Sequence, residues 1–321
     1  MKYLKGELKF KDISEVLWLD IESCPIEKEL TEDSVYWNAW YNKVKYDDKI
    51  GDTNKEIIKS YNEKAGLYRE FSKIVSVSYG IVRNGKLKVK NVVGNEVDII
   101  NTLFADIDSF RVKGGIRFLG VFSGKQFDIP FIHYRAVVNK IVPNELVDTG
   151  GLAPWSIKHV IDVQDILRGG GMTNLSLNGV CASFGIPSPK DGEVNALKVR
   201  DMYYSGNIKA ISEYNNKDVL ATCNAFLHYL NKDYVEMEIV ESTYVDEVKS
   251  SRHPLTALYR AVDISEQTEK YIRDSTVKML KKDRAIVEDL LCKIYINNKM
   301  FQADKPERKE SKKKQIKELL E

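Results

Sequence analysis

The sequence predicts an α/β fold in which a mixed β-sheet is flanked by helices and is followed by a helical C-terminal extension. Within residues 1–232, short apolar or alternating runs typical of strands are interspersed with segments whose apolar residues recur at helical spacing. Beyond about residue 232 these strand signals stop and the chain becomes highly charged, ending in KPERKESKKKQIKELLE. We therefore expect one domain at residues 1–232 and a charged, helical extension at residues 233–321.

Five segments have the composition of strands, and they lie at residues 15–21, 73–82, 86–93, 117–122 and 158–163. The first is EVLWLDI, whose apolar run indicates a buried strand. Asn84-Gly85 separates the second segment from the third, and this dipeptide favours a two-residue hairpin turn. We therefore expect the second and third strands to form an antiparallel hairpin.

Four segments have helical spacing of apolar residues, and they lie at residues 96–110, 127–139, 176–185 and 207–230. Residues 26–70 are polar and rich in lysine, which indicates an insertion of loops and short helices. Trp37, Trp40 and Tyr41 in this insertion have two interpretations: they anchor it by packing, or they stack on the bases of a single strand. Packing is the favoured interpretation because large aromatic side chains are mostly buried.

The composition is that of an ordinary globular protein, with 43% hydrophobic and 30% charged residues and a formal net charge of +2. The four cysteines form no CxxC pair, so they indicate neither a disulfide framework nor a zinc site. The N-terminal residues lack the apolar run of a secretion signal, and no segment approaches the ~20 apolar residues of a membrane span. We expect a cytoplasmic protein that does not associate with membranes.

Asp20 and Glu22 stand at the end of the first predicted strand. Residues two apart on a strand point to the same face, so the two carboxylates converge. Neighbouring carboxylates repel each other unless a cation lies between them. A DxE pair is nevertheless common, and the alternative is that the two residues begin a solvated loop.

Two further acidic residues follow at longer range. Asp128 comes after the fourth strand in GKQFDIPF, where it is equally well interpreted as a helix N-cap or as a metal ligand. Tyr214 and Asp218 are four residues apart on the last long helix and therefore share one face. Their alternative interpretation is a packed tyrosine beside an exposed aspartate.

Together, these four carboxylates and the tyrosine are typical of a site that binds two magnesium ions for phosphodiester hydrolysis. Hard divalent cations prefer carboxylate oxygens, and Mg²⁺ retains waters that act as nucleophiles. Two ions about 3.5–4 Å apart stabilise both the attacking and the leaving oxygen.

This ordered set of motifs resembles the DEDD superfamily of 3′–5′ exonucleases, which have a ribonuclease-H-like fold. The tyrosine form is indicated because Tyr214 stands four residues before Asp218, whereas Glu213 occupies the place of the histidine in the other form. The sequence is most similar to free-standing proteins related to the proofreading domain of family-B DNA polymerases. The likeness covers about residues 14–230 and is carried by LWLDIESCP (17–25), KAGLYREFSKIVSVSYG (64–80), GKQFDIPFIHYRA (124–136) and residues 176–230.

The resemblance implies a role for each residue of the set. Asp20, Glu22 and Asp218 would hold the Mg²⁺ that carries the attacking water, and Asp20 would bridge to a second Mg²⁺ bound by Asp128. Tyr214 would orient the water by a hydrogen bond. Mn²⁺ would substitute for Mg²⁺. The product would be a nucleoside 5′-monophosphate released from the 3′ end of single-stranded DNA.

The resemblance also implies substrate contacts at Ser23, Cys24, Ser123 and Phe127, the first two through their backbone. Ser123 is a departure, because related enzymes usually have an asparagine at this position, five residues before the third carboxylate. A serine still donates a hydrogen bond, but its side chain is shorter. The departure therefore puts the contact with the substrate strand in doubt, and not the binding of metal.

Several alternatives stay open from the sequence. The same chemistry on RNA gives an exoribonuclease, and a copy without activity would be a module that binds nucleic acid or a replication or polymerase partner. Asp162 and Asp165 are interpreted as turn or cap residues that do not join the site. The four histidines show no ligand spacing, and Lys312, Lys313 and Lys314 belong to a solvated tail unless they hold phosphates.

Overall fold

A computed structural model describes residues 12–47, 49–51, 53–153, 156–189 and 198–245, all of which fall within one compact unit, Met1–Val245. Residues 246–321, including the lysine-rich tail, lie outside the described residues. Among the helices that the structure describes, none is long and apolar enough to cross a membrane.

A six-stranded mixed sheet forms the centre of this unit, with the strand order β5-β4-β1-β2-β3-β6. The strands are β1 (Val16–Pro25), β2 (Ser72–Arg83), β3 (Lys86–Gly94), β4 (Phe118–Val121), β5 (Val160–Asp162) and β6 (Glu236–Val245). The pairs β1–β2 and β2–β3 are antiparallel, whereas β1–β4, β4–β5 and β3–β6 are parallel. The expected α/β class with a mixed sheet is confirmed, and the arrangement is consistent with a ribonuclease-H-like fold.

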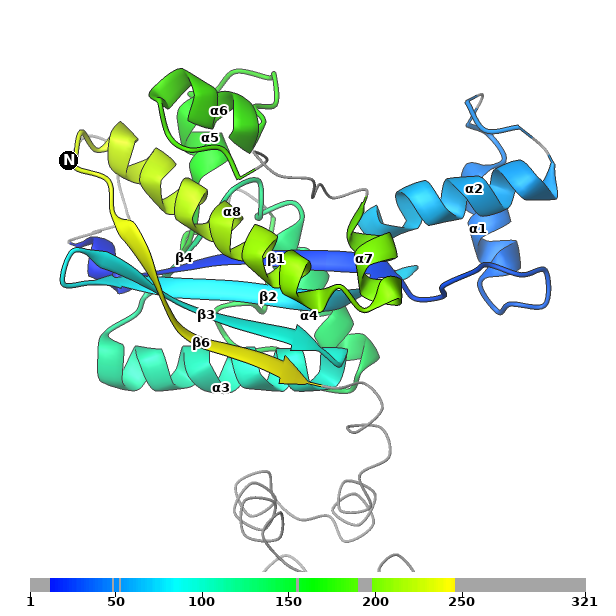
Figure 1. Cartoon of the computed structure of the whole chain (residues 1–321), viewed down its shortest axis with the longest axis horizontal. Coiled ribbons are helices and arrows are strands. Elements are labelled where there is room, and N and C mark those ends of the chain that lie inside the picture. Colours follow the sequence, from blue (N-terminus) through cyan, green and yellow to red (C-terminus); the bar gives the residue numbers. More distant parts are fainter. Residues whose placement is uncertain (1–11, 48, 52, 154–155, 190–197, 246–321) are drawn as a thin grey trace, which may run out of the picture. The chain divides into compact units, whose positions relative to one another are not determined.

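Helices cover both faces of the sheet (Figure 1). They are α1 (Trp37–Val44), α2 (Asn54–Lys64), α3 (Glu96–Gly114), α4 (Asp128–Val138), α5 (Val163–Arg168), α6 (Leu177–Phe184), α7 (Val199–Ser205) and α8 (Ile208–Tyr229). In Figure 1, α3 runs along one face and α8 crosses the other, with α5 and α6 beyond it. A short 3₁₀ turn, η2 (Ala65–Leu67), connects α2 to β2 through four further residues.

The central strand β1 contributes to a separate hydrophobic core on each face of the sheet. Leu17 and Leu19 belong to the core under α3 and α4, whereas Val16 and Trp18 belong to the core under α6 and α8. Trp18 contacts Phe226 of α8, with the ring centroids 5.4 Å apart. The alternation of β1 therefore decides which of its side chains face α8.

Two glycines flank Trp18 on the neighbouring strands, and the one on β4 makes room for its indole ring. Gly80 on β2 and Gly120 on β4 are its register partners on either side. A Cβ at Gly120 would lie 2.5 Å from the Trp18 ring, and a Cβ at Gly80 would lie 2.8 Å from the carbonyl oxygen of Lys88. Both positions therefore require glycine.

The expected hairpin between β2 and β3 is present. Asn84 and Gly85 have φ angles of 51° and 74°, and both angles fall in the left-handed region that a type I′ turn requires. The eight register pairs between the two strands, from Ser76–Val93 to Arg83–Lys86, follow from this turn.

The expectation that the helical extension begins at residue 233 is wrong for residues 236–245, which form β6 and pair in parallel with β3. The charged residues of this segment made it look like part of a solvated helix. Glu238 pairs with Lys88 and Glu241 with Lys90, so the acidic residues of β6 meet basic residues of β3. Opposite charges on neighbouring strands stabilise such pairing.

The insertion at residues 26–70 has a small hydrophobic core of its own, formed with Phe71. Trp40 is fully buried there, its ring meets Tyr61 edge to face at 5.4 Å, and its indole N–H donates to Ser60. The packing interpretation is therefore confirmed for Trp40. Tyr41 is exposed.

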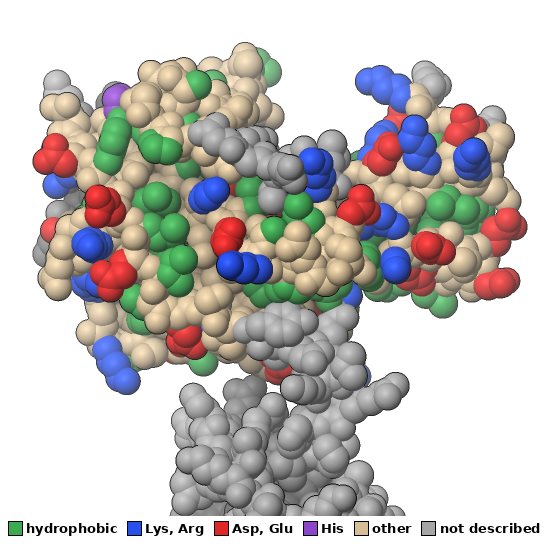
Figure 2. All heavy atoms as spheres, viewed as in Figure 1, with side chains coloured by type: hydrophobic (Ala, Val, Ile, Leu, Met, Phe, Trp, Pro, Cys, Tyr) green, Lys and Arg blue, Asp and Glu red, His purple; other side chains and the backbone are tan. Residues whose placement is uncertain are grey.

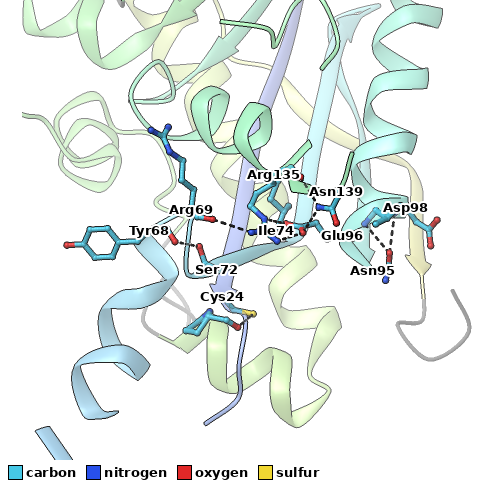
Figure 3. Close-up of polar contacts among 12 residues, drawn as sticks. Cys24, Tyr68, Arg69, Ser72, Ile74, Asn95, Glu96, Asp98, Arg135 and Asn139 are labelled. Carbon is cyan, nitrogen blue, oxygen red and sulfur yellow. Dashed lines mark hydrogen bonds and ion pairs between the residues drawn. The ribbon is translucent and has the colours of Figure 1, made fainter. Parts of the chain in front are cut away.

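A buried ion pair connects α3, α4 and the start of β2 (Figure 3). Both carboxylate oxygens of Glu96 accept hydrogen bonds from the guanidinium of Arg135, at 2.8 and 2.7 Å. The same carboxylate accepts the backbone N–H of Ile74 at 2.7 Å and the side-chain amide of Asn139 at 2.8 Å. The buried charges are thus fully hydrogen-bonded, as burial requires.

This ion pair supports an irregularity beside Glu22. The register between β1 and β2 shifts between Glu22 and Ser23, so that Glu22 pairs with Ser76 and Ser23 with Ile74. Val75 is the extra residue of this bulge, and the N–H of Ile74 is satisfied by Glu96. Bulges of this kind commonly occur beside functional sites, where they re-aim a side chain.

Replacing Arg135 by Met is expected to destabilise the fold by about 3–5 kcal/mol, because it leaves the Glu96 charge buried without its partner. The measurement is thermal unfolding followed by circular dichroism. Lys59→Ala is the control: it breaks an ion pair between exposed side chains on α2 and is expected to cost less than about 1 kcal/mol. Equal losses of stability in the two variants would contradict the role of Arg135 as the buried partner of Glu96.

Candidate active site

Asp20 and Glu22 lie on the face of β1 that α8 covers. On this face they continue the series Val16, Trp18, so carboxylates replace apolar side chains where the strand leaves the core. β1 extends to Pro25, four residues beyond the expected end, and Glu22 is therefore inside the strand. Glu22 is buried, and Asp20 is half-buried.

Tyr214 and Asp218 approach these carboxylates from α8. Both side chains are buried, so the alternative of an exposed Asp218 is wrong. One carboxylate oxygen from each of Asp20, Glu22 and Asp218 lies within 4.8 Å of the others. The Tyr214 hydroxyl lies near enough to Asp218 for the charge of that carboxylate to raise the tyrosine pKa. Their spacing of four residues on α8 thus places the Tyr214 hydroxyl and the Asp218 carboxylate on the same side of the helix, facing Asp20 and Glu22.

Asp128 is the first residue of α4, and its carboxylate faces β1. Its Oδ1 accepts the backbone N–H of Ile21 at 3.2 Å. β4 ends at Val121, and the carboxylate satisfies this N–H where the neighbouring strand has ended. The N-cap residue of α4 is Phe127, and its side chain makes no capping hydrogen bond. The N-cap interpretation of Asp128 is therefore wrong.

The turn that delivers Asp128 is held by Asp162, whose carboxylate accepts the backbone N–H groups of Ser123 at 2.9 Å and of Lys125 at 3.0 Å. The same carboxylate caps α5, so the expected cap is confirmed, but its link to the site was missed. Gly124 was also missed. A Cβ there would lie 2.9 Å from Asp128 Oδ2, so this close approach requires glycine.

A cavity of about 390 Å³ collects most of the residues that the sequence singled out. Those that line it are Asp20, Glu22, Ser23, Ser123, Phe127, Asp128, Tyr214 and Asp218. Cys24 is the exception: its side chain is fully buried against Val199, Tyr203 and Ile211, so any contact with substrate would come from its backbone.

Other residues that line the cavity come from segments to which the sequence assigned no site residue. Asn62 and Glu63 of α2, Gly66 and Leu67 of η2 and Arg200 of α7 line it. The Ser23 hydroxyl donates to the carbonyl oxygen of Gly66 at 2.7 Å, which holds the end of the insertion against β1. The stretch 64–80 carries part of the family likeness, but the sequence assigned it no contact with β1, because that contact depends on how the chain folds back.

The electrostatics of the site are those of crowded, buried negative charge. The pKa of Asp20 is raised well above its ordinary value, first by burial and then by the charges of Asp128, Asp218 and Glu22. Burial likewise raises the pKa of Asp128 to about 7. Burial and the Asp218 charge raise the pKa of Tyr214, which therefore stays a neutral hydroxyl. A divalent cation would relieve this repulsion.

The site thus belongs to the class of carboxylate clusters that can bind divalent metal ions, set at the centre of an α/β sheet. Residues 66–274 match a family described as predicted 3′–5′ exonucleases related to the exonuclease domain of PolB. The match spans more than half of the chain, so the chain belongs to this family and is an exonuclease enzyme. Asp128, Tyr214 and Asp218 fall within the matched residues, whereas Asp20 and Glu22 precede them.

Among solved structures, the family B DNA polymerase from the hyperthermophilic archaeon Pyrobaculum calidifontis is similar, with 13% sequence identity and a TM-score of 0.42. The similarity covers 67% of this chain and 24% of the polymerase, so the chain corresponds to about a quarter of that protein's length. No curated protein matches the chain.

The stability of the metal-free protein is expected to fall as the pH rises from 3.8 to about 7. The pKa of Asp128 is raised on folding, so the folded state binds more protons than the unfolded state in this pH window. The stabilisation that comes from the protonated Asp128 is therefore lost as this carboxyl ionises. Asp128→Asn should raise the melting temperature in EDTA at neutral pH, by roughly 2–4 °C per kcal/mol relieved.

Asp233→Asn, at an exposed carboxylate, is the control for this measurement and should leave the pH profile unchanged. Addition of Mn²⁺ should stabilise the wild-type protein more at high pH than at low pH, because the cation binds the ionised carboxylates. A melting temperature of wild type that rises with pH in EDTA, and a profile of Asp128→Asn that matches it, would refute the account.

Proposed function

We propose that this chain is a metal-dependent 3′–5′ exonuclease that removes nucleoside 5′-monophosphates from the 3′ end of single-stranded DNA. It would act in proofreading, repair or replication, on ends that a polymerase or another partner leaves. The convergence of Asp20, Glu22 and Asp218 within 4.8 Å carries the proposal, in a chain that belongs to an exonuclease family.

The donor set fits hard divalent cations, because it consists of carboxylate oxygens without histidine or cysteine. Asp20, Glu22 and Asp218 would hold one Mg²⁺, and Asp20 and Asp128 a second. When bound, the two ions would stabilise the charge on the attacking and leaving oxygens. Mn²⁺ has similar ligand preferences and would substitute.

The protein's own groups would position the reactants. Tyr214, whose raised pKa keeps it a neutral hydroxyl, would orient the attacking water by a hydrogen bond rather than act as a base. The cavity of about 390 Å³ is at the lower end of the size of small-molecule pockets, which suits one terminal nucleotide. Phe127 and Leu67 would supply its apolar sides.

The charge distribution outside the cavity suits recognition of a strand end. Figure 2 shows Lys and Arg side chains interspersed with Asp and Glu side chains on the face in view, including the part that carries α1 and α2. On that face, basic residues do not gather into a patch that would hold a long duplex. Arg200 lines the cavity and would lie beside the substrate, with its guanidinium also paired with Asp201 at 2.6 Å.

The first test is cleavage of matched DNA and RNA oligonucleotides labelled at the 3′ or 5′ end, in Mg²⁺. We expect release of labelled mononucleotide from the 3′ end of DNA at early times, and a ladder of shortened products from the 5′-labelled strand. Faster release of nucleotides from the RNA oligonucleotide would mean that RNA, and not DNA, is the substrate. Internal cleavage products alone would contradict the exonuclease mechanism.

Asp20→Asn and Asp218→Asn are expected to lower kcat by about 10²–10⁴-fold, because metal-assisted charge stabilisation contributes several kcal/mol. Glu213→Gln is the matched control, since Glu213 neighbours Tyr214 on α8 but is exposed and pairs with Lys209. It should retain activity within about twofold, which corresponds to the small effect of a surface ion pair. Full activity of Asp20→Asn would refute the proposal.

Tyr214→Phe is expected to lower kcat by about 5–150-fold, the effect of losing one hydrogen bond of about 1–3 kcal/mol. The affinity for Mn²⁺, measured by calorimetry, should stay unchanged, because the hydroxyl is not a proposed ligand. A loss of Mn²⁺ affinity that parallels the loss of kcat would assign Tyr214 to the metal site instead.

A further inference from the structure

We propose that Asn215 is a positioning residue that fixes the orientation of Asp20, and that a buried chain of hydrogen bonds from β3 fixes Asn215 in turn. The inference rests on the proposed function, since it explains how a ligand of that site is held. Asn215 is fully buried and follows Tyr214 on α8. Its side-chain amide donates a hydrogen bond to Asp20 Oδ2 at 2.5 Å.

The chain of hydrogen bonds begins at Asn91 on β3, which is fully buried between β2 and α8. The Asn91 side-chain amide donates to the hydroxyl oxygens of Ser76 at 3.1 Å and of Ser78 at 2.6 Å, both on β2. Each serine hydroxyl in turn donates a hydrogen bond to an asparagine of α8. Ser76 donates to Asn215 Oδ1 at 2.9 Å, and Ser78 donates to Asn216 Oδ1 at 2.7 Å.

This pattern determines which way the amide of Asn215 faces. Ser76 accepts from Asn91 and donates its own proton to Asn215 Oδ1. The amide nitrogen of Asn215 is thereby directed at Asp20. The reversed amide would place its oxygen against a carboxylate oxygen, with two acceptors facing each other. Ser76 on one side and the Asp20 carboxylate on the other thus together set the orientation of the Asn215 amide.

An amide is well suited to this task. It gives the carboxylate a hydrogen bond while adding no positive charge that would compete with a cation, as Lys or Arg would. Outer groups that orient metal ligands typically affect metal affinity by about 10–100-fold. A buried polar network is costly beneath a helix that otherwise packs on apolar side chains, and the hydrogen bonds through Ser76 and Ser78 offset part of that cost.

Asn216 provides a matched control within the same network. It is buried to a similar degree, stands next to Asn215 on α8 and accepts from Ser78 as Asn215 accepts from Ser76. The Asn215 branch ends on Asp20, a carboxylate of the cavity, whereas Ser78 donates to the Asn216 side chain. Two alanine variants one residue apart therefore separate positioning of Asp20 from packing of α8.

The experiment compares Asn215→Ala with Asn216→Ala in the full-length chain, by Mn²⁺ calorimetry, thermal unfolding and steady-state kinetics on single-stranded DNA. We expect similar losses of stability in both variants. Only Asn215→Ala should weaken Mn²⁺ binding and lower kcat, each by about 10–100-fold, with KM for DNA changed less than about threefold. Asn216→Ala should keep both values within about threefold of wild type.

The serines provide a second pair, which also serves if Asn215→Ala does not fold. Ser76→Ala should follow Asn215→Ala in direction, and Ser78→Ala should follow Asn216→Ala. Equal Mn²⁺ affinities in the two members of each pair would overturn the positioning role, even if the wild-type protein is an active nuclease. A wild-type protein that binds Mn²⁺ without cleaving DNA, and loses that binding in Asn215→Ala, would overturn the proposed function alone. A wild-type protein without Mn²⁺ affinity would overturn both.

Discussion

Mutual repulsion among buried carboxylates is the constraint on which the arrangement around the cavity depends. Asp20, Glu22 and Asp218 approach one another within 4.8 Å, and Asp128 lies close enough to raise the pKa of Asp20 further. Such a cluster opposes folding in the absence of a cation. The surrounding structure must therefore hold together carboxylates that come from three elements, β1, α4 and α8.

The means of holding them are hydrogen bonds from neutral or backbone donors. Asn215 donates to Asp20, and the backbone of Ile21 donates to Asp128. The turn before Asp128 is tied by Asp162, and the bulge beside Glu22 is supported by the ion pair of Glu96 with Arg135. Arg135, the cation of that pair, thus contacts Glu96 rather than the carboxylates of the cluster. The negative charge of the site would therefore be available to a metal ion.

The carboxylates and the tyrosine that line the cavity could be predicted as a group from the sequence because each occurs in a local pattern: i, i+2 on a strand, FD after a strand, and i, i+4 on a helix. The strands, the hairpin turn and the long helices likewise follow from local periodicity and turn chemistry. β6 was missed because its charges suggested a solvated helix, whereas lysines on β3 pair with them. Asp162 and Asn215 were not assigned to the site because their partners are distant in sequence. The same holds for Asn62 and Arg200, which reach the cavity only through the fold of the insertion and α7.

The central claim is that the carboxylate cluster binds divalent metal. It is tested most directly by anomalous diffraction from crystals of the protein grown with Mn²⁺. We predict anomalous peaks between Asp20, Glu22 and Asp218 and between Asp20 and Asp128, both absent in Asp20→Asn crystals. Carboxylates free of Mn²⁺ at a concentration that supports cleavage, or ions bound only elsewhere on the protein, would contradict the account.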